Sequence, residues 1–180
     1  MSPDPPRTLV LLRHGKSAYP PGVLDHDRPL ADRGRRQAAL AGEHVRTHLD
    51  HIDLVLCSTS ERTRQTLEAS GLAAGARVEY RGEIYCGEPE EILDLIVEVP
   101  ASVATLLVVG HFPGIPELAE ELAGPGSDAE ALAGIERKFP TSAFAVVTVA
   151  GPWSGLPKTG RLVNVTVPRE HPEPAPEETR

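Results

Sequence analysis

Three short apolar runs that alternate with helical stretches constrain the fold of this chain more than any other feature. The runs are Leu9–Leu12, Ile52–Cys57 and Thr105–Val109, and each has the length of a strand buried on both faces. Helical composition appears over Arg33–His48, Glu61–Ala69 and Glu88–Val99, and a short helix is expected after Pro113. This alternation predicts an α/β fold, a three-layer α/β/α sandwich with a mostly parallel central sheet.

The last part of the chain predicts two further strands. Phe144–Val149 and Arg161–Val167 flank the turn-rich segment Gly151–Gly160, so a hairpin there would make the sheet mixed. A length of 180 residues with 40% hydrophobic content suits one domain, which we assign to residues 7–167. The ends, residues 1–6 and 168–180, are rich in proline and charge and are predicted to be disordered.

The charge distribution argues against a nucleic-acid partner. The formal net charge is −8, whereas nucleic-acid binding favours a basic surface. Residues 1–70 hold ten Lys and Arg against nine Asp and Glu, and the remainder holds eight against seventeen. The positive charge is therefore concentrated in the half that carries the first strand, which is consistent with an anionic ligand there.

No segment predicts membrane insertion or export. The apolar runs are much shorter than the roughly 20 residues that span a bilayer, and the first is shorter than the core of a signal peptide. We therefore expect no membrane association and a cytoplasmic location. Cys57 and Cys86 form no pair motif, and His44, His48 and His51 lack partners at metal-ligand spacing, so neither a metal nor another cofactor is expected.

All three buried strands end in side chains that suit a phosphate group. The first ends at Arg13-His14-Gly15, and the third ends at Gly110-His111. The second ends at Ser58 and leads into a helix that carries Arg62. The carboxyl ends of parallel strands share one edge of a sheet, where such folds bind ligands, and guanidinium groups match phosphoryl oxygens. The sequence predicts a phosphate pocket with two arginines and two histidines.

The ordered set of these motifs resembles the histidine phosphatase superfamily, the phosphoglycerate mutase-like group. A finer similarity is to the small SixA-like phosphohistidine phosphatases, and the resemblance covers roughly Leu9–Val149. The residues that carry it are Arg13–Ser17, Asp27–Gly34, Arg62-Thr63, Val109–His111 and Pro140–Ala143. The resemblance implies a phosphoglycerate mutase-like fold. Only one helix is expected between Glu83 and Thr105, so no large lid is predicted.

The resemblance also implies catalytic roles. His14 would attack phosphorus and form a phosphohistidine intermediate that water then hydrolyses. Attack requires a neutral imidazole, which neighbouring arginines favour by disfavouring imidazolium. Arg13, Arg62 and His111 would bind the phosphoryl oxygens and stabilise the charge that develops during transfer, so no metal would be needed.

Two further residues are candidates for supporting roles. Glu83 lies in the region where the family often supplies a carboxylate, and it is the candidate proton donor to the leaving group. Arg28 follows the nucleophile turn and would either contact substrate or pair with Asp25 or Asp27. Lys16 and Ser17 are kept outside the core catalytic set.

The predicted activity is metal-independent hydrolysis of phosphohistidine in a protein or of small phosphate esters. The partner would thus be a phosphorylated protein or a small phosphate ester. Two alternatives stay open: a non-catalytic module that binds phosphoprotein through the same arginines, and a phosphomutase acting on sugar phosphates. The presence of both core histidines favours the enzyme, and the absence of a large lid disfavours the mutase.

Overall fold

A six-stranded sheet forms the centre of the molecule, with the strand order β3-β2-β4-β1-β5-β6. The computed structural model describes residues 5–170. The strands are β1 (Arg7–Arg13), β2 (Leu54–Ser58), β3 (Arg77–Arg81), β4 (Thr105–Gly110), β5 (Phe144–Val149) and β6 (Gly160–Thr166). The α-helices are α1 (Asp32–Val45), α2 (Glu61–Ser70), α3 (Pro89–Val97), α4 (Gly114–Glu121) and α5 (Ala129–Arg137). Single 3₁₀ turns are η1 (Asp25–Asp27), η2 (Gly82–Ile84) and η3 (Trp153–Gly155).

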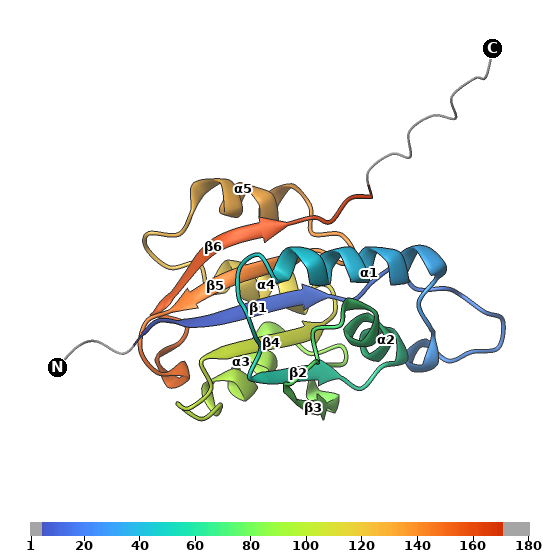
Figure 1. The fold of residues 1–180 in the computed structure, drawn as a ribbon, viewed down its shortest axis with the longest axis horizontal. Coiled ribbons are helices and arrows are strands. Elements are labelled where there is room, and N and C mark those ends of the chain that lie inside the picture. The colour runs from blue at the N-terminus through green and yellow to red at the C-terminus, as the bar shows by residue number, and fades with distance from the viewer. Residues whose placement is uncertain (1–4, 171–180) are drawn as a thin grey trace, which may run out of the picture.

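The sheet is parallel from β3 to β1, and β5 pairs antiparallel with both β1 and β6. The predicted late hairpin is therefore present and makes the sheet mixed. Figure 1 shows the carboxyl ends of β1, β2 and β4 at the same edge of the sheet. Register places Arg13 beside Gly110 and Cys57 beside Val109, so the three polar strand ends meet there.

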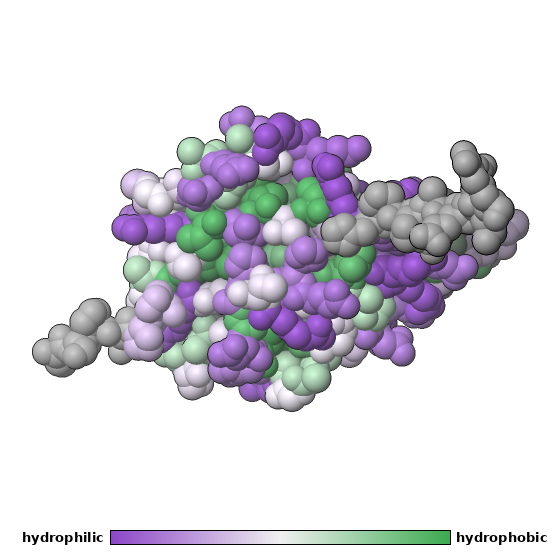
Figure 2. Space-filling view, turned by 45° about the horizontal axis from the view of Figure 1, so that its top comes forward, coloured by the Kyte–Doolittle hydropathy of each residue, from purple (hydrophilic) through white to green (hydrophobic). Residues whose placement is uncertain are grey.

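Each side of β1 belongs to a different hydrophobic core. Leu9 and Leu11 pack into the cluster with α3 and α4, whereas Val10 and Leu12 pack into the cluster with α1 and α2. Successive side chains of a strand point to opposite faces, so a continuous apolar run fills both layers. The predicted three-layer α/β/α sandwich is confirmed. A space-filling view shows mostly hydrophilic residues on one outer face, with smaller hydrophobic areas between them (Figure 2).

Two elements were not predicted from the sequence. β3 is an edge strand in which Arg77, Glu79 and Arg81 alternate with Val78 and Tyr80, so it lacks the apolar run that marks the inner strands. α5 is a short helix that buries only Ala131 fully, so its apolar face is weak in the sequence. Between β3 and β4 the structure has only η2 and α3, which agrees with the prediction that no large lid is present.

The predicted tails lie partly outside the described residues. At the start of α1, Ala31 is the N-cap and Asp32 lies in the first turn, where a carboxylate interacts favourably with the helix dipole. Residues 1–4 and 171–180 are not among those described. Of the described tail, Pro168 is buried and the Glu170 carboxylate accepts a hydrogen bond from Arg36. Among residues 5–170, no helix is long and apolar enough to cross a membrane.

Candidate active site

The turn that follows β1 is held by hydrogen bonds from three separate parts of the fold. The His14 N–H donates to the Gly110 carbonyl at the end of β4 (3.0 Å). The Gly15 N–H donates to the Thr66 hydroxyl of α2 (2.9 Å). The Ser142 N–H donates to the His14 carbonyl (3.0 Å), which explains why Pro140–Ala143 belongs to the sequence pattern. This turn is therefore fixed in place before any ligand binds.

Close packing also requires glycine at this turn. A Cβ at Gly15 would lie 2.7 Å from the Gly34 carbonyl oxygen, and a Cβ at Gly34 would lie 2.1 Å from the Lys16 carbonyl oxygen. The Ala31 N–H donates to that same Lys16 carbonyl (2.9 Å). The start of α1 is thus packed directly against the turn that carries His14, and any side chain at Gly34 would separate them.

The His14 imidazole is oriented by its own loop. Its Nδ1 lies 2.7 Å from the Gly15 carbonyl oxygen, which can only accept, so Nδ1 carries the proton and Nε2 keeps its lone pair in the neutral ring. The residue is 8% exposed. Burial, with the positive charges of Arg62, Arg13 and Arg28, lowers the pKa of His14 to about 4. His14 is therefore a neutral imidazole at pH 7 with Nε2 available.

Arginines surround this imidazole in an open pocket of about 170 Å³. The pocket is lined by Arg13, His14, Lys16, Ser17, Tyr19, Arg28, Arg62 and Thr141. Arg13 donates through Nη1 to the Phe139 carbonyl (2.8 Å), while its buried Nε has no partner among the described residues. A buried N–H of a guanidinium without an acceptor favours an anionic ligand in this pocket.

Asp25 of η1 connects the other two arginines. Its carboxylate accepts from Arg62 Nη2 (3.1 Å), Arg28 Nη1 (2.8 Å) and the Tyr85 hydroxyl (2.7 Å). The Tyr85 hydrogen bond and the two arginines lower the pKa of Asp25 to about 2, against the opposing effect of burial. Arg28 therefore pairs with Asp25, as one of the two interpretations expected, and it also lines the pocket.

His111 lies beside His14, with ring centroids 5.1 Å apart. Its Nε2 is 2.8 Å from the Ser58 hydroxyl oxygen, so the ends of β2 and β4 are joined by this contact. Burial, with His14 and Arg62, lowers the pKa of His111 to about 3, and its buried Nδ1 has no hydrogen-bond partner within residues 5–170. Donation from the Ser58 hydroxyl to Nε2 would place the ring proton on Nδ1, where it could be donated to a ligand.

Comparison with known proteins agrees with this geometry. The histidine phosphatase superfamily (branch 1) profile matches residues 9–89. An uncharacterized protein of Mycobacterium tuberculosis is 49% identical over 160 residues, covering 88% of this chain and 100% of that relative. The SixA candidate phosphohistidine phosphatase of Nakamurella multipartitia is 42% identical in its solved structure, with a TM-score of 0.82, covering 93% of this chain and 99% of that one. The chain belongs to the histidine phosphatase superfamily.

Two further solved structures resemble this chain. The protein histidine phosphatase SixA in complex with tungstate is 26% identical, with a TM-score of 0.71, over 89% of this chain and 97% of that one. A phosphoglycerate mutase of Plasmodium falciparum, 13% identical with a TM-score of 0.62, shares the fold. The predicted superfamily, the SixA-like similarity and the phosphoglycerate mutase-like fold are thereby confirmed.

Of the predicted site residues, Glu83 does not line the pocket. Arg13, His14, Arg28 and Arg62 line the pocket together, and His111 adjoins it. The side chain of Glu83 in η2 is 52% exposed, and its carboxylate accepts from Arg81 (3.1 Å). That hydrogen bond lowers the pKa of Glu83, which favours the ionised form over the protonated form that a general acid needs.

Sequence reasoning did not assign Asp25, Tyr85, Tyr19 or Thr141 to the site. Asp25 and Tyr85 are 60 residues apart, and their contact depends on how the loop before α1 folds against Arg62. Tyr19 follows the nucleophile motif and stacks under Arg28, whose guanidinium carbon is 3.6 Å from the ring centroid. In the sequence, the contact between Tyr19 and Arg28 was indicated only by the presence of an aromatic residue shortly after the Arg13–Ser17 motif.

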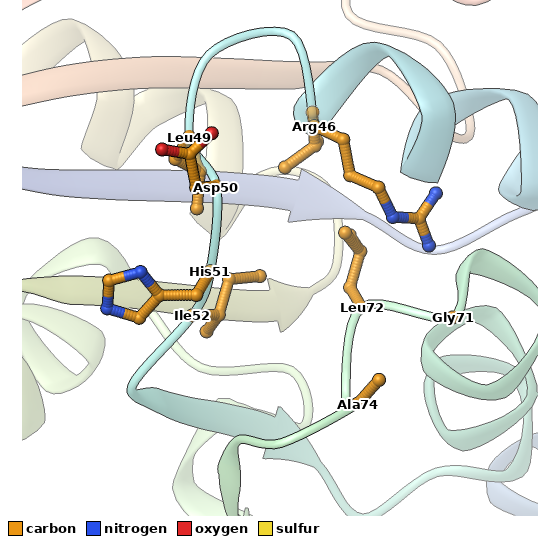
Figure 3. A pocket seen from close by; sticks show the side chains of 9 residues that line it. Arg46, Leu49, Asp50, His51, Ile52, Gly71, Leu72 and Ala74 are labelled. Atoms are coloured by element: carbon orange, nitrogen blue, oxygen red, sulfur yellow. The ribbon is translucent and has the colours of Figure 1, made fainter.

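A second cavity, of about 140 Å³, lies at the far edge of the sheet from the pocket beside His14. It forms between the end of α1 and the segment after α2, and Figure 3 shows Leu49, Ile52 and Leu72 along it. The Arg46 side chain extends toward Gly71 and donates to the Ser70 carbonyl (2.8 Å). Across residues 5–170, no group of three or more His, Cys, Asp or Glu side chains could hold a metal ion.

Proposed function

We propose that this histidine phosphatase hydrolyses phosphohistidine carried by a protein, through transient phosphorylation of His14 at Nε2. The observation that carries the proposal is the hydrogen bond from His14 Nδ1 to the Gly15 carbonyl, which leaves an unprotonated Nε2 beside a pocket rich in arginine. A lone pair on a fixed, neutral imidazole is the group that nucleophilic attack on phosphorus requires.

The first step transfers the phosphoryl group to the enzyme. The Nε2 lone pair of His14 forms a bond to phosphorus while the phosphorus–nitrogen bond of the substrate breaks. The substrate ring, which carries a proton on its other nitrogen, takes that electron pair and leaves as a neutral imidazole. Arg13 and Arg62 supply hydrogen bonds and positive charge to the equatorial oxygens, and the Nδ1–H of His111 supplies a third donor.

The second step restores the enzyme. Water attacks phosphorus on the opposite side from His14, the bond from Nε2 breaks, and inorganic phosphate departs. The low pKa of His14 makes the neutral imidazole a suitable leaving group in this step, because the electron pair returns to Nε2 without a proton. Arginines provide throughout the charge stabilisation that a metal ion supplies in other phosphoryl-transfer enzymes.

The openness of the site supports a protein substrate. Within residues 5–170, the chain between β3 and β4 forms no large lid over the pocket, since its regular elements are η2 and α3 alone. A phosphohistidine side chain on a folded partner could therefore reach His14. The relative solved with tungstate is described as a protein histidine phosphatase, which agrees with this substrate class.

A turnover screen tests the proposal. Purified protein is assayed against a protein carrying phosphohistidine, free phosphoamino acids and sugar phosphates, with His14→Ala as the matched control. We expect the phosphohistidine protein to be the preferred substrate and His14→Ala to be inactive. Substantial activity in His14→Ala would reject the mechanism, tight binding without turnover would favour the binding module, and positional transfer on a sugar phosphate would favour the mutase.

A further inference from the structure

A basic groove continues from the catalytic pocket across the carboxyl edge of the sheet. Its volume is about 580 Å³, and it is bordered by Lys16, Arg33, Lys138 and Arg169, the four residues that define the basic groove here. Lys16 and Thr141 line both this groove and the catalytic pocket, so the two spaces adjoin. A ligand whose phosphoryl group lies against His14 can therefore extend into the groove.

The groove is assembled from segments that are distant in the sequence. Lys16 belongs to the nucleophile turn, Arg33 to the first turn of α1, Lys138 to the residue after α5, and Arg169 to the segment after β6. In Figure 1, β1 and β6 point the same way, and α1 begins at the edge of the sheet where these two strands end. The fold thus gathers four positive side chains beside the pocket of a chain whose net charge is −8.

The four basic side chains are not neutralised by the part of the protein that the structure describes. None of them forms an ion pair with a carboxylate within residues 5–170. The carboxylate that borders the groove, Glu170, is 2.9 Å from Arg36. Arg33, Lys138 and Arg169 are exposed, so their charge is directed at solvent or at a binding partner rather than at the interior.

We propose that the basic groove binds an acidic segment of the phosphoprotein substrate, next to its phosphohistidine. The inference rests on the proposed function, because it assigns the substrate of that same site. Unpaired positive charge that adjoins a phosphoryl pocket complements a carboxylate-rich segment, and such complementarity raises association rates and selects partners. Pro140 and Val167 form apolar parts of the groove, so aliphatic stems of acidic residues can also pack there.

The test compares two synthetic peptides that carry one phosphohistidine each. One peptide has three glutamates beside the phosphohistidine, and the other has three glutamines. The groove variant is Arg33→Glu with Lys138→Glu and Arg169→Glu. The matched control is Arg77→Glu with Lys158→Glu and Arg161→Glu, which makes the same change in net charge at the far edge of the sheet.

For the wild-type protein, kcat/KM is expected to be about tenfold higher for the acidic peptide, and the preference should weaken as salt is raised. The groove variant should lose the preference, mainly through KM, while the control keeps it. Turnover of p-nitrophenyl phosphate should stay within about threefold in both variants, because this ester occupies only the catalytic pocket. Loss of the preference with retained ester turnover would support the groove proposal.

Several results would overturn it. The groove proposal would be rejected by equal kcat/KM for the two peptides, or by a preference for the acidic peptide that persists in the groove variant. If the wild-type protein still hydrolyses the ester, neither result would count against the proposed function. Failure of the wild-type protein to hydrolyse either peptide or the ester would instead reject the proposed function. If the full-length protein shows no preference and deletion of residues 171–180 creates a groove-dependent one, the occupant of the groove in the full-length protein would be the chain's own acidic end. Groove-dependent binding of a single-stranded oligonucleotide would make it a nucleic-acid site.

Discussion

At the scale of single residues, the proposed chemistry depends on which nitrogen of His14 carries the proton. The Gly15 carbonyl accepts from Nδ1, so the assignment follows from a hydrogen bond to a group that cannot donate. Burial and three arginines then keep the ring neutral, with a pKa of about 4 instead of 6.5. The fold thus sets the orientation, tautomer and charge state of the His14 ring before any ligand binds.

This tautomer can be observed directly. In a sample with ¹⁵N-labelled histidine, we expect the His14 signals at pH 7 to show a protonated Nδ1 and an unprotonated Nε2. On titration, the ring should remain neutral down to about pH 4, because burial disfavours its charged form. A midpoint near 6.5, or a protonated Nε2 at pH 7, would contradict this account of the site.

Glu83 separates two classes of substrate. Its exposed carboxylate is paired with Arg81, which favours the ionised form. An imidazole leaving group needs little assistance from an acid, so we expect Glu83→Gln to change phosphohistidine turnover by less than about threefold. Initial rates on a phosphohistidine peptide and on an alkyl phosphate ester, each with wild-type protein and the variant, provide the measurement. A loss of roughly 10²–10⁴-fold confined to the ester would assign the leaving-group proton to Glu83, whereas equal large losses would make it a structural residue.

At the scale of elements, the start of α1 and the nucleophile turn behave as one packed unit. The Lys16 carbonyl accepts from the Ala31 N–H, and Gly34 lies against the same carbonyl. The Asp27–Gly34 segment therefore belongs to the catalytic motif for a steric reason, although it contributes only Arg28 to the pocket.

Gly34→Ala should therefore weaken both stability and activity. The added methyl group would lie 2.1 Å from the Lys16 carbonyl oxygen, so the helix or the turn must move, at a cost of about 1–3 kcal/mol in the free energy of unfolding. Urea denaturation and kcat measure the two effects. Gly82→Ala is the matched control, because nothing lies within 4 Å of its added Cβ, and equal behaviour of the two variants would refute this steric role of Gly34.

The inner strands and the pocket could be predicted because two physical rules govern them. Runs buried on both faces are apolar throughout, and the carboxyl ends of parallel strands must meet, so Arg13, Arg62 and His111 could be brought together without coordinates. β3 and α5 could not be predicted, since an edge strand and a weakly buried helix need no such run. The contact of Asp25 with Tyr85 and the basic groove depend on how loops and chain ends fold together, which local sequence does not encode.

At the scale of the whole molecule, two buried histidines are held neutral beside the positively charged side chains of Arg13 and Arg62. The pKa values of His14 and His111 are about 4 and 3 in the folded protein, against 6.5 for an unperturbed histidine. Between about pH 6.5 and pH 4 the unfolded chain therefore binds more protons at these residues than the folded protein does. Stability must fall as pH decreases through this window.

Urea denaturation at pH 7.0 and pH 5.0 measures this cost. The free energy of unfolding of the wild-type protein should be lower at pH 5.0, and the variant His14→Ala with His111→Ala should lose much of that difference. The window lies above the range in which Asp25, with a pKa of about 2, is protonated in the folded state. Equal pH dependence of the two proteins would show that these histidines are not held neutral.

The most direct measurement of the central claim is the trapping of a phosphoryl group on His14. Enzyme mixed with a ³²P-labelled phosphohistidine protein is quenched in alkali within the first turnover, where phosphohistidine survives, and the labelled peptide is sequenced by mass spectrometry. We expect label on Nε2 of His14 in the wild-type protein and none in His14→Ala. Steady turnover with no labelled enzyme, or label on Nδ1 or on another residue, would contradict the central claim.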